Sequence, residues 1–283
     1  MDKLTIRYTL TAPVSHIGQT ASTGSYFNTV MTSQGELPVI TGNSVRGILR
    51  DCGAKRLLDA YGKPVDKETF NVLFSGGNIS GAAKNDVARA KQVREHFPLI
   101  SLLGAGLGTM MMGGTLLSGF LYPICMESRG ITHIASDVSW HDLMGDIEFT
   151  RMDDTKDDTL LSRLTDVDEE KTAKASTQMR FSVQYMAPGT EFVQQMCLLD
   201  TATDFERGCL YDCLAKWFET PTLGGMRSKG FGTFDADIPG VMSVANGAVH
   251  VEPTAQELID QYLVSLSPNT LGVYMSLLRT GGK

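Results

Sequence analysis

The amino-acid sequence predicts an α+β fold in which two strand–helix–strand units share one sheet. Residues 4–11 alternate apolar and polar side chains, as a half-buried strand does, and residues 39–61 then have the pattern of a helix. Residues 179–199 alternate on both sides of a turn, which predicts a β-hairpin. A helix pattern at 203–219 and a strand pattern at 233–238 complete the split βαβ order of a ferredoxin-like or RRM-like core.

The first predicted helix has a start signal and two distinct faces. Thr41 and Ser44 offer side-chain oxygens that can cap its first turn. Arg46 and Arg50 lie four residues apart and therefore share one face. The other face is apolar and should pack on the sheet; it consists of Val45, Ile48, Leu49 and Cys52.

Large segments lie outside this core pattern and predict insertions. Residues 12–37 are rich in Ser, Thr, Gly and Asn, which predicts a long loop. Residues 82–96 predict an exposed helix or an ordered insertion. We therefore expect one discontinuous domain over residues 1–283, with a helical or finger insertion at 60–130 and an arm at 145–178 whose polar composition favours flexibility.

The negative charge of the chain is unevenly distributed. The 283 residues carry a formal charge of -7 at pH 7. Residues 135–170 contain twelve carboxylates and three basic side chains, so this segment carries -9 and the rest of the chain sums to +2. Because phosphate binding depends on the local field, the composition leaves room for a basic groove outside the acidic segment.

Cysteine content and hydropathy predict a cytoplasmic protein. The five cysteines form no C-x-x-C pair, and the first ten residues contain no apolar signal region. Residues 98–126 contain no charged side chain and are long enough to cross a bilayer. Six glycines and Pro123 in this segment favour turns and strands, so we expect no membrane span.

We find no motif for a metal or a cofactor. The histidines have no ligand spacing, and Cys209 and Cys213 are expected to pack in the core. The glycine-rich run at 103–108 lacks the third glycine of a dinucleotide fingerprint, because Thr109 stands there. Residues 224–232 form a second glycine-rich segment. In it Ser228 precedes Lys229 instead of following it, so the segment is not a P-loop.

Two segments carry a resemblance to a known family. Residues 38–50, PVITGNSVRGILR, resemble the PxIPGSSLKGxLR segment that begins the first helix of the RAMP superfamily of CRISPR proteins. Residues 224–232, GGMRSKGFG, resemble the glycine-rich loop of the same superfamily, where the RNA backbone is approached closely. The two segments stand in the family's order, at the two ends of one split βαβ domain.

Within that superfamily the chain looks like the "Cas seven" backbone subunit of a class 1 effector complex, and most like the type IV version. It has the size of that subunit, an arm where the family has its thumb, and stretches at 102–106 and 113–121 that resemble the type IV sequence. The resemblance implies that copies line up along a crRNA, with a complementary target, a "Cas five"-like cap, other effector subunits and, in one type IV branch, a helicase as partners. Arg151 and Met152 would belong to the thumb.

The resemblance and the residue chemistry together give a candidate RNA-binding set. Glycines let backbone amides approach phosphate oxygens, a helix N-terminus favours an anion, and Arg and Lys add charge-assisted hydrogen bonds. Such contacts position RNA without reading its sequence. The candidate residues are Asn43, Ser44, Arg46, Gly47, Arg50, Gly225, Met226, Arg227, Ser228 and Lys229.

We expect this chain to bind RNA without catalysis. In cleaving members of the superfamily a loop aspartate holds a divalent ion, but residues 11–35 contain no Asp or Glu and Asn28 stands in the corresponding region. Two alternatives stay open. One is a metal-dependent backbone subunit that cleaves target RNA, and the other is a small-molecule enzyme whose glycine loop holds a phosphate.

Overall fold

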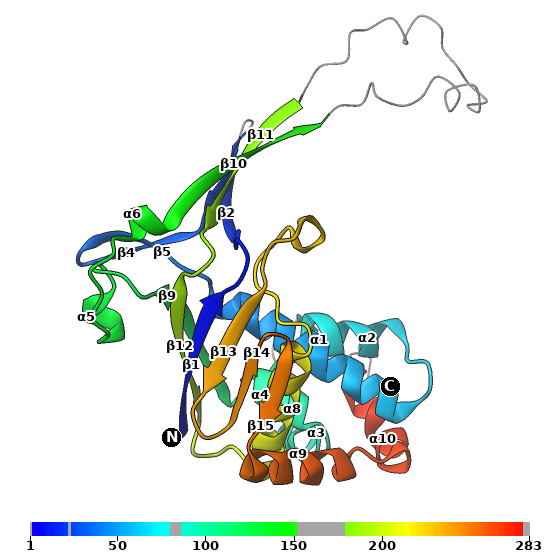
Figure 1. Cartoon of the computed structure of the whole chain (residues 1–283). Helices are drawn as coiled ribbons and strands as arrows, with labels where there is room; N and C mark the ends of the chain where they lie inside the picture. The colour runs from blue at the N-terminus through cyan, green and yellow to red at the C-terminus, as the bar shows by residue number, and fades with distance from the viewer. Residues whose placement is uncertain (1, 22–23, 80–85, 152–178, 280–283) are drawn as a thin grey trace, which may run out of the picture.

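A six-stranded antiparallel sheet forms the centre of the fold (Figure 1). The computed structural model describes residues 2–21, 24–79, 86–151 and 179–279. The strand order is β15-β14-β13-β1-β12-β9. These strands are β1 (Asp2–Leu10), β9 (Leu116–Pro123), β12 (Glu191–Leu198), β13 (Phe234–Ile238), β14 (Met242–Ala245) and β15 (Ala248–Val251).

The predicted α+β fold with a ferredoxin-like core is confirmed. Along the chain, β1 is followed by α1 (Gly42–Tyr61) and β9, and β12 is followed by α8 (Asp204–Phe218) and β13. In the sheet these four strands have the order β13-β1-β12-β9, so the first and third core strands lie in the middle. This is the split βαβ arrangement.

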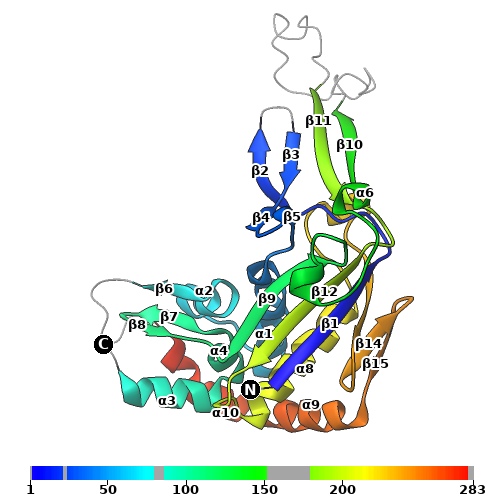
Figure 2. The same cartoon turned by 90° about the vertical axis from the view of Figure 1, so that its left-hand side faces the viewer.

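The sheet has one face covered by helices and one open face. Residues Leu4, Ile6, Tyr8 and Leu10 of β1 are buried, whereas the residues between them are exposed, as the alternation predicts. Figure 2 looks onto the open face, with α1 and α8 behind the strands. Trp217 and Phe218 of α8 pack into the core, and the ring of Tyr8 lies 6.0 Å from that of Trp217. The expectation that Cys209 and Cys213 are core residues is also confirmed.

The predicted hairpin over residues 179–199 is wrong in its pairing. Both strands form, as β11 (Met179–Met186) and β12, and the turn between them closes with a hydrogen bond from Thr190 to Ala187. However, β11 pairs with β10 (Met144–Arg151) and β12 pairs with β1 and β9. The turn therefore leads from one sheet into another, and the second core strand is β9.

After β1, residues 11–16 lead into an arm that projects from the body of the protein (Figure 1). Residues 12–37 are not the loop we predicted, because cross-strand pairing gives them four strands. A four-stranded sheet in the order β10-β11-β3-β2 forms the arm, and β4 pairs with β5 at its base. The new strands are β2 (Ile17–Ala21), β3 (Gly24–Phe27), β4 (Thr29–Thr32) and β5 (Gly35–Pro38).

The first residues of the expected arm at 145–178 therefore belong to strand β10. Arg151 is the last residue of β10, and β10 pairs along its length with β11. Met152 and the rest of the expected thumb lie outside the described residues.

The expected insertion at 60–130 ends earlier than predicted, because β9 belongs to the central sheet. Before β9 the chain forms small helices and a three-stranded sheet, and two short helices, α5 (Arg129–Thr132) and α6 (Trp140–Leu143), follow it. None of the helices in the described ranges combines the length and the apolar character needed to span a membrane. The elements before β9 are α2 (Lys67–Ser75), β6 (Gly77–Ile79), α3 (Val87–His96), α4 (Pro98–Leu103), β7 (Ala105–Gly108) and β8 (Met110–Met112).

The C-terminal part of the chain packs below the sheet in Figure 1. It contains α9 (Pro253–Ser265), α10 (Pro268–Tyr274) and the 3-10 helix η2 (Met275–Leu278). Helix α9 packs closely on α8 at Gly208. A Cβ at this position would lie 2.2 Å from the carbonyl oxygen of Leu258 in α9.

Candidate nucleic-acid interface

The N-terminus of α1 lies beside His16. Thr41 is the N-cap, and its hydroxyl accepts a hydrogen bond from the backbone N–H of Ser44 at 3.4 Å. The backbone N–H of Thr41 donates to Nε2 of His16 at 3.3 Å. Burial lowers the pKa of His16, so the ring is neutral at pH 7 and Nε2 can accept this bond. Asn43 is exposed, so the positive end of the helix dipole is open to an anion.

The glycine-rich loop packs against the residues that precede His16. The backbone N–H of Gly225 donates to the carbonyl oxygen of Ser15 at 2.8 Å, and that of Gly232 donates to Pro13 at 2.8 Å. Gly224 has a φ of +69°, and a Cβ there would lie 2.3 Å from the carbonyl oxygen of Ser15. Only glycine fits this position. The start of α1 and the glycine-rich loop, the two segments identified in the sequence, therefore both contact residues 13–16.

The tip of this loop is exposed and strained. Met226 has a φ of +59°, which is uncommon for a residue other than glycine. The next residues form a short 3-10 helix, η1 (Arg227–Lys229), in which Arg227, Ser228 and Lys229 are all exposed. Strain of this kind is often retained in loops that bind a ligand.

Lys229 connects the loop to the arm. Its Nζ lies 4.3 Å from the ring centroid of Phe149 in β10 and 4.9 Å from that of Phe181 in β11. The rings of Tyr185 and Phe231 extend this aromatic cluster, with their centroids 6.3 Å apart. A cation over aromatic faces is attracted by the ring quadrupoles, so the ammonium group holds the loop against strands β10 and β11 of the arm.

Arg46 and Arg50 contact a different part of the protein. Nη2 of Arg46 donates to the carbonyl oxygen of Leu103 at 2.6 Å, and Nη2 of Arg50 donates to Gly104 at 2.8 Å. Both side chains thus bind the C-terminal carbonyls of α4, where a cation is favoured. Burial, and secondly the charge of Arg46, lowers the pKa of Arg50 to about 10, so Arg50 stays protonated at neutral pH.

The described contacts therefore divide the basic candidates into two groups. Arg46 and Arg50 bind α4, whereas Lys229 binds the arm. The sequence analysis places these residues and Arg227 in one candidate RNA-binding set, which would form a single groove. That shared groove stays a prediction, and the carbonyl contacts give both arginines of α1 a structural role that sequence spacing did not reveal.

The region of Asn28 contains a carboxylate that the sequence analysis missed. The β4–β5 hairpin brings Glu36 back beside Thr29, whose hydroxyl donates to Oε1 of Glu36 at 2.8 Å. Asn28 and Glu36 both line a hollow of about 350 Å³, together with Trp140 and Gln184. A hairpin signal within residues 29–38 could have predicted this proximity.

The described residues hold no cluster of three or more His, Cys, Asp or Glu side chains that could bind a metal ion. The five cysteines are all present as free thiols.

Comparison with known proteins agrees with the sequence resemblance. The family model of the RAMP superfamily matches residues 7–235. Among solved structures, a chain of the "Type IV-B CRISPR Complex" is similar with a TM-score of 0.60 and 17% sequence identity, over 89% of this chain and 94% of that chain. At this identity the similarity shows the fold alone. A comparison with curated proteins found no match. Because the family match spans most of the sequence and both motif segments, the chain belongs to the RAMP superfamily.

Proposed function

We propose that this chain is a backbone subunit of a CRISPR effector complex, in which several copies bind along a crRNA and present it to a complementary target. Membership of the RAMP superfamily and the fold shared with a chain of the Type IV-B CRISPR complex support this proposal. The main observation behind the proposal is that the N-terminus of α1 and the glycine-rich loop both form hydrogen bonds to residues 13–16.

The proposed contacts are made to phosphate oxygens and not to bases. Asn43 and Ser44 stand at the positive end of α1, and the exposed side chains of η1 add hydrogen-bond donors and charge. Gly47 supports close approach of a ligand to α1. It is exposed, and none of the described residues beyond its own helical turn lies within 4 Å of a Cβ placed there, so packing does not require glycine. A glycine inside a helix costs about 1 kcal/mol relative to Ala.

Arg46 and Arg50 belong to the same proposed surface, but they test it poorly. Their bonds to Leu103 and Gly104 mean that an alanine variant would change the stability of the fold as well as RNA binding. Arg227 is exposed on η1, so its replacement isolates a phosphate contact better, whereas replacement of Lys229 also removes the contacts with Phe149 and Phe181.

Assembly along RNA requires each copy to use two different surfaces, because head-to-tail contacts are not self-complementary. We propose that the arm, with Arg151 at the end of β10, takes part in one of these contacts. The other partners in this proposal are a cap subunit, further effector subunits and, for one type IV branch, a helicase.

Gel filtration with absorbance at 260 and 280 nm tests the proposed function. The protein purified from cells that express a guide RNA is expected to elute as a large particle with a nucleic-acid spectrum. Ribonuclease treatment should reduce its mass, because the RNA holds the copies together. A monomer free of nucleic acid under both conditions would contradict the proposal.

We further propose that the assembled protein binds its target without cutting it. Asn28 offers an amide where cleaving members of the superfamily have a carboxylate, and a divalent ion prefers charged oxygens. Glu36 favours the alternative of metal-assisted cleavage, because the hairpin brings this carboxylate into the same hollow.

Incubation of the RNA-loaded protein with end-labelled complementary RNA or DNA, in magnesium or manganese, distinguishes these two proposals. We expect intact target in every lane, and no difference between the wild type and Glu36→Gln. Products at regular spacing that disappear in Glu36→Gln would establish the cleaving alternative. Thr29→Val is the matched control, since it removes the hydrogen bond to Glu36 without removing the carboxylate.

A further inference from the structure

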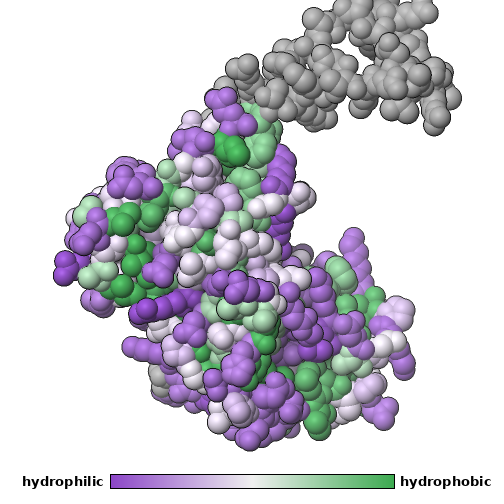
Figure 3. All heavy atoms as spheres, viewed as in Figure 1, coloured by the Kyte–Doolittle hydropathy of each residue, from purple (hydrophilic) through white to green (hydrophobic). Residues whose placement is uncertain are grey.

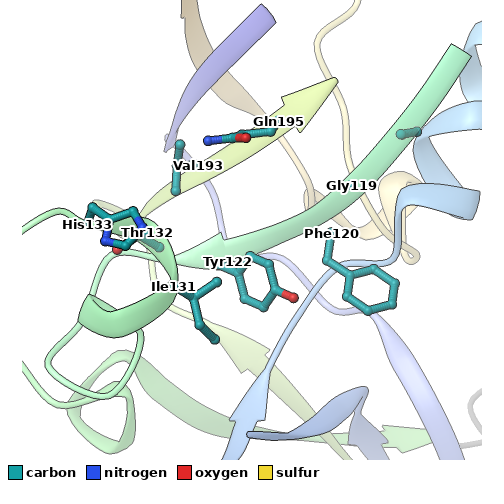
Figure 4. Close-up of a pocket in the computed structure, with 9 residues that line it drawn as sticks. Gly119, Phe120, Tyr122, Ile131, Thr132, His133, Val193 and Gln195 are labelled. Atoms are coloured by element: carbon teal, nitrogen blue, oxygen red, sulfur yellow. The ribbon is translucent and has the colours of Figure 1, made fainter. Parts of the chain in front are cut away.

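The open face of the central sheet carries a pocket that the proposed phosphate contacts do not use (Figure 4). Its volume is about 510 Å³, which is within the range of small-molecule sites. Strands β9 and β12 form its floor, and α5 with the residue after it forms one wall. The side chains that carry the argument are Phe120 and Tyr122 of β9, Gln195 of β12, and Thr132 and His133 beside α5.

The lining of this pocket combines aromatic rings with neutral hydrogen-bonding groups. Phe120 and Tyr122 present two rings with centroids 6.2 Å apart and planes at 68°. Gln195 and Thr132 offer an amide and a hydroxyl, and the described residues that line the pocket include no Asp, Glu, Lys or Arg. Such a surface suits a planar, uncharged ring with donors and acceptors at its edge, and it does not suit a phosphate or a metal ion.

A β-bulge directs Phe120 into this position. Gln194 pairs with Leu121 and Met196 pairs with Ser118, so Gly119 and Phe120 together oppose the single residue Gln195. Bulges change the direction of a side chain and are frequent next to binding sites. Phe120 remains 38% exposed, although a fully packed sheet would bury a residue of this size.

The pocket adjoins the N-terminus of α1. On the edge of β9 that faces away from β12, Ile40 pairs with Leu121, and the chain then enters α1 at Gly42. A Cβ at Gly42 would lie 2.2 Å from the carbonyl oxygen of Ser118, which also lines the pocket. One strand therefore separates the pocket from the exposed Asn43 of the proposed phosphate site.

We infer that this pocket binds a nucleobase of the single-stranded RNA whose phosphates lie at the N-terminus of α1. This inference rests on the proposed function, because it assigns a second contact to the same bound strand. The base stacks on Phe120 or Tyr122, and the neutral groups bind its edge. Stacking of this kind accepts any base, which suits a protein that carries different guide sequences.

Fluorescence anisotropy of a short labelled single-stranded RNA tests the inference with Phe120→Ala. The variant is expected to bind about 5- to 100-fold more weakly than the wild type, as for the loss of one stacked base. The dependence of its affinity on salt should be unchanged, because no phosphate contact is lost. The double variant Arg227→Ala, Lys229→Ala should instead flatten that dependence. An abasic strand of equal length should bind Phe120→Ala and wild type alike.

Phe205→Ala is the matched control, since Phe205 is 47% exposed on α8 and does not line this pocket. Wild-type affinity in Phe120→Ala would overturn the inference and leave the proposed function standing. A lower mass of the RNA-bound assembly with unchanged RNA affinity would overturn it in favour of a neighbouring protein copy in the pocket. Wild-type protein that does not bind RNA at all would overturn both proposals.

Discussion

Arg56→Ala is expected to lower the free energy of unfolding by about 3 kcal/mol, measured by urea denaturation. Arg56 of α1 donates to both carboxylate oxygens of Asp212 in α8, at 3.0 and 2.7 Å. The Asp212 side chain is only 3% exposed, so removal of the guanidinium leaves a buried carboxylate without its partner. We place the loss at the low end for buried pairs, because the Arg56 side chain is 28% exposed and water can partly replace it.

Lys216→Ala provides the matched control for this ion pair. Lys216 of α8 also pairs with a carboxylate, that of Glu219 just after the helix, but their side chains are 36% and 55% exposed. An exposed pair contributes about 0–1 kcal/mol, so this variant should unfold close to the wild type. Equal losses for the two variants would show that the pair between α1 and α8 does not stabilise the core.

Gly224→Ala is expected to destabilise the protein by about 2–5 kcal/mol and to weaken RNA binding. The left-handed backbone at Gly224, with a φ of +69°, costs about 1–2 kcal/mol for a residue with a Cβ. The added methyl would also lie 2.3 Å from the carbonyl oxygen of Ser15, which forces a backbone shift that costs about 1–3 kcal/mol more. Thermal unfolding and RNA anisotropy measure the two effects.

Gly230→Ala separates backbone strain from the steric clash. Gly230 has a φ of +82°, but apart from its chain neighbours none of the described residues lies within 4 Å of a Cβ placed there. This variant should lose only about 1–2 kcal/mol, and the loop should keep its contact with Ser15. If both variants bind RNA as the wild type does, the position of this loop does not matter for binding.

The elements that were predicted correctly are those whose sequence signal lies within a few neighbouring residues. The alternation in β1 and the capping oxygen of Thr41 before α1 are local signals, and both elements form as expected. The strand β9 was missed because the bulge at Gly119 and Phe120 breaks its alternation. The pairing of β11 was wrong because its partner β10 lies across the segment 152–178, and a turn does not reveal such a distant partner.

The candidate site follows the same division between local and distant signals. The motif segments around Ser44 and Gly225 were visible as sequence, but their meeting depends on Ser15 and His16, which carry no motif. The bonds from Arg46 and Arg50 to α4 join residues more than fifty positions apart in the sequence. Periodicity places residues on faces of one helix and cannot identify the element that such a face contacts.

The position of Lys229 over Phe149 and Phe181 has a thermodynamic consequence. An anion that draws the ammonium group of Lys229 off these rings breaks the cation–π contacts. Any ligand that takes the ammonium away from the rings therefore loosens the contact between the loop and the arm, and any partner that holds the ammonium on these rings weakens anion binding by the same factor. A cation–π contact at an exposed site contributes about 0.5–1 kcal/mol, so this linkage is limited to roughly two- to fivefold. The arm and the loop thus adjust one another's affinity over a narrow range, in either direction.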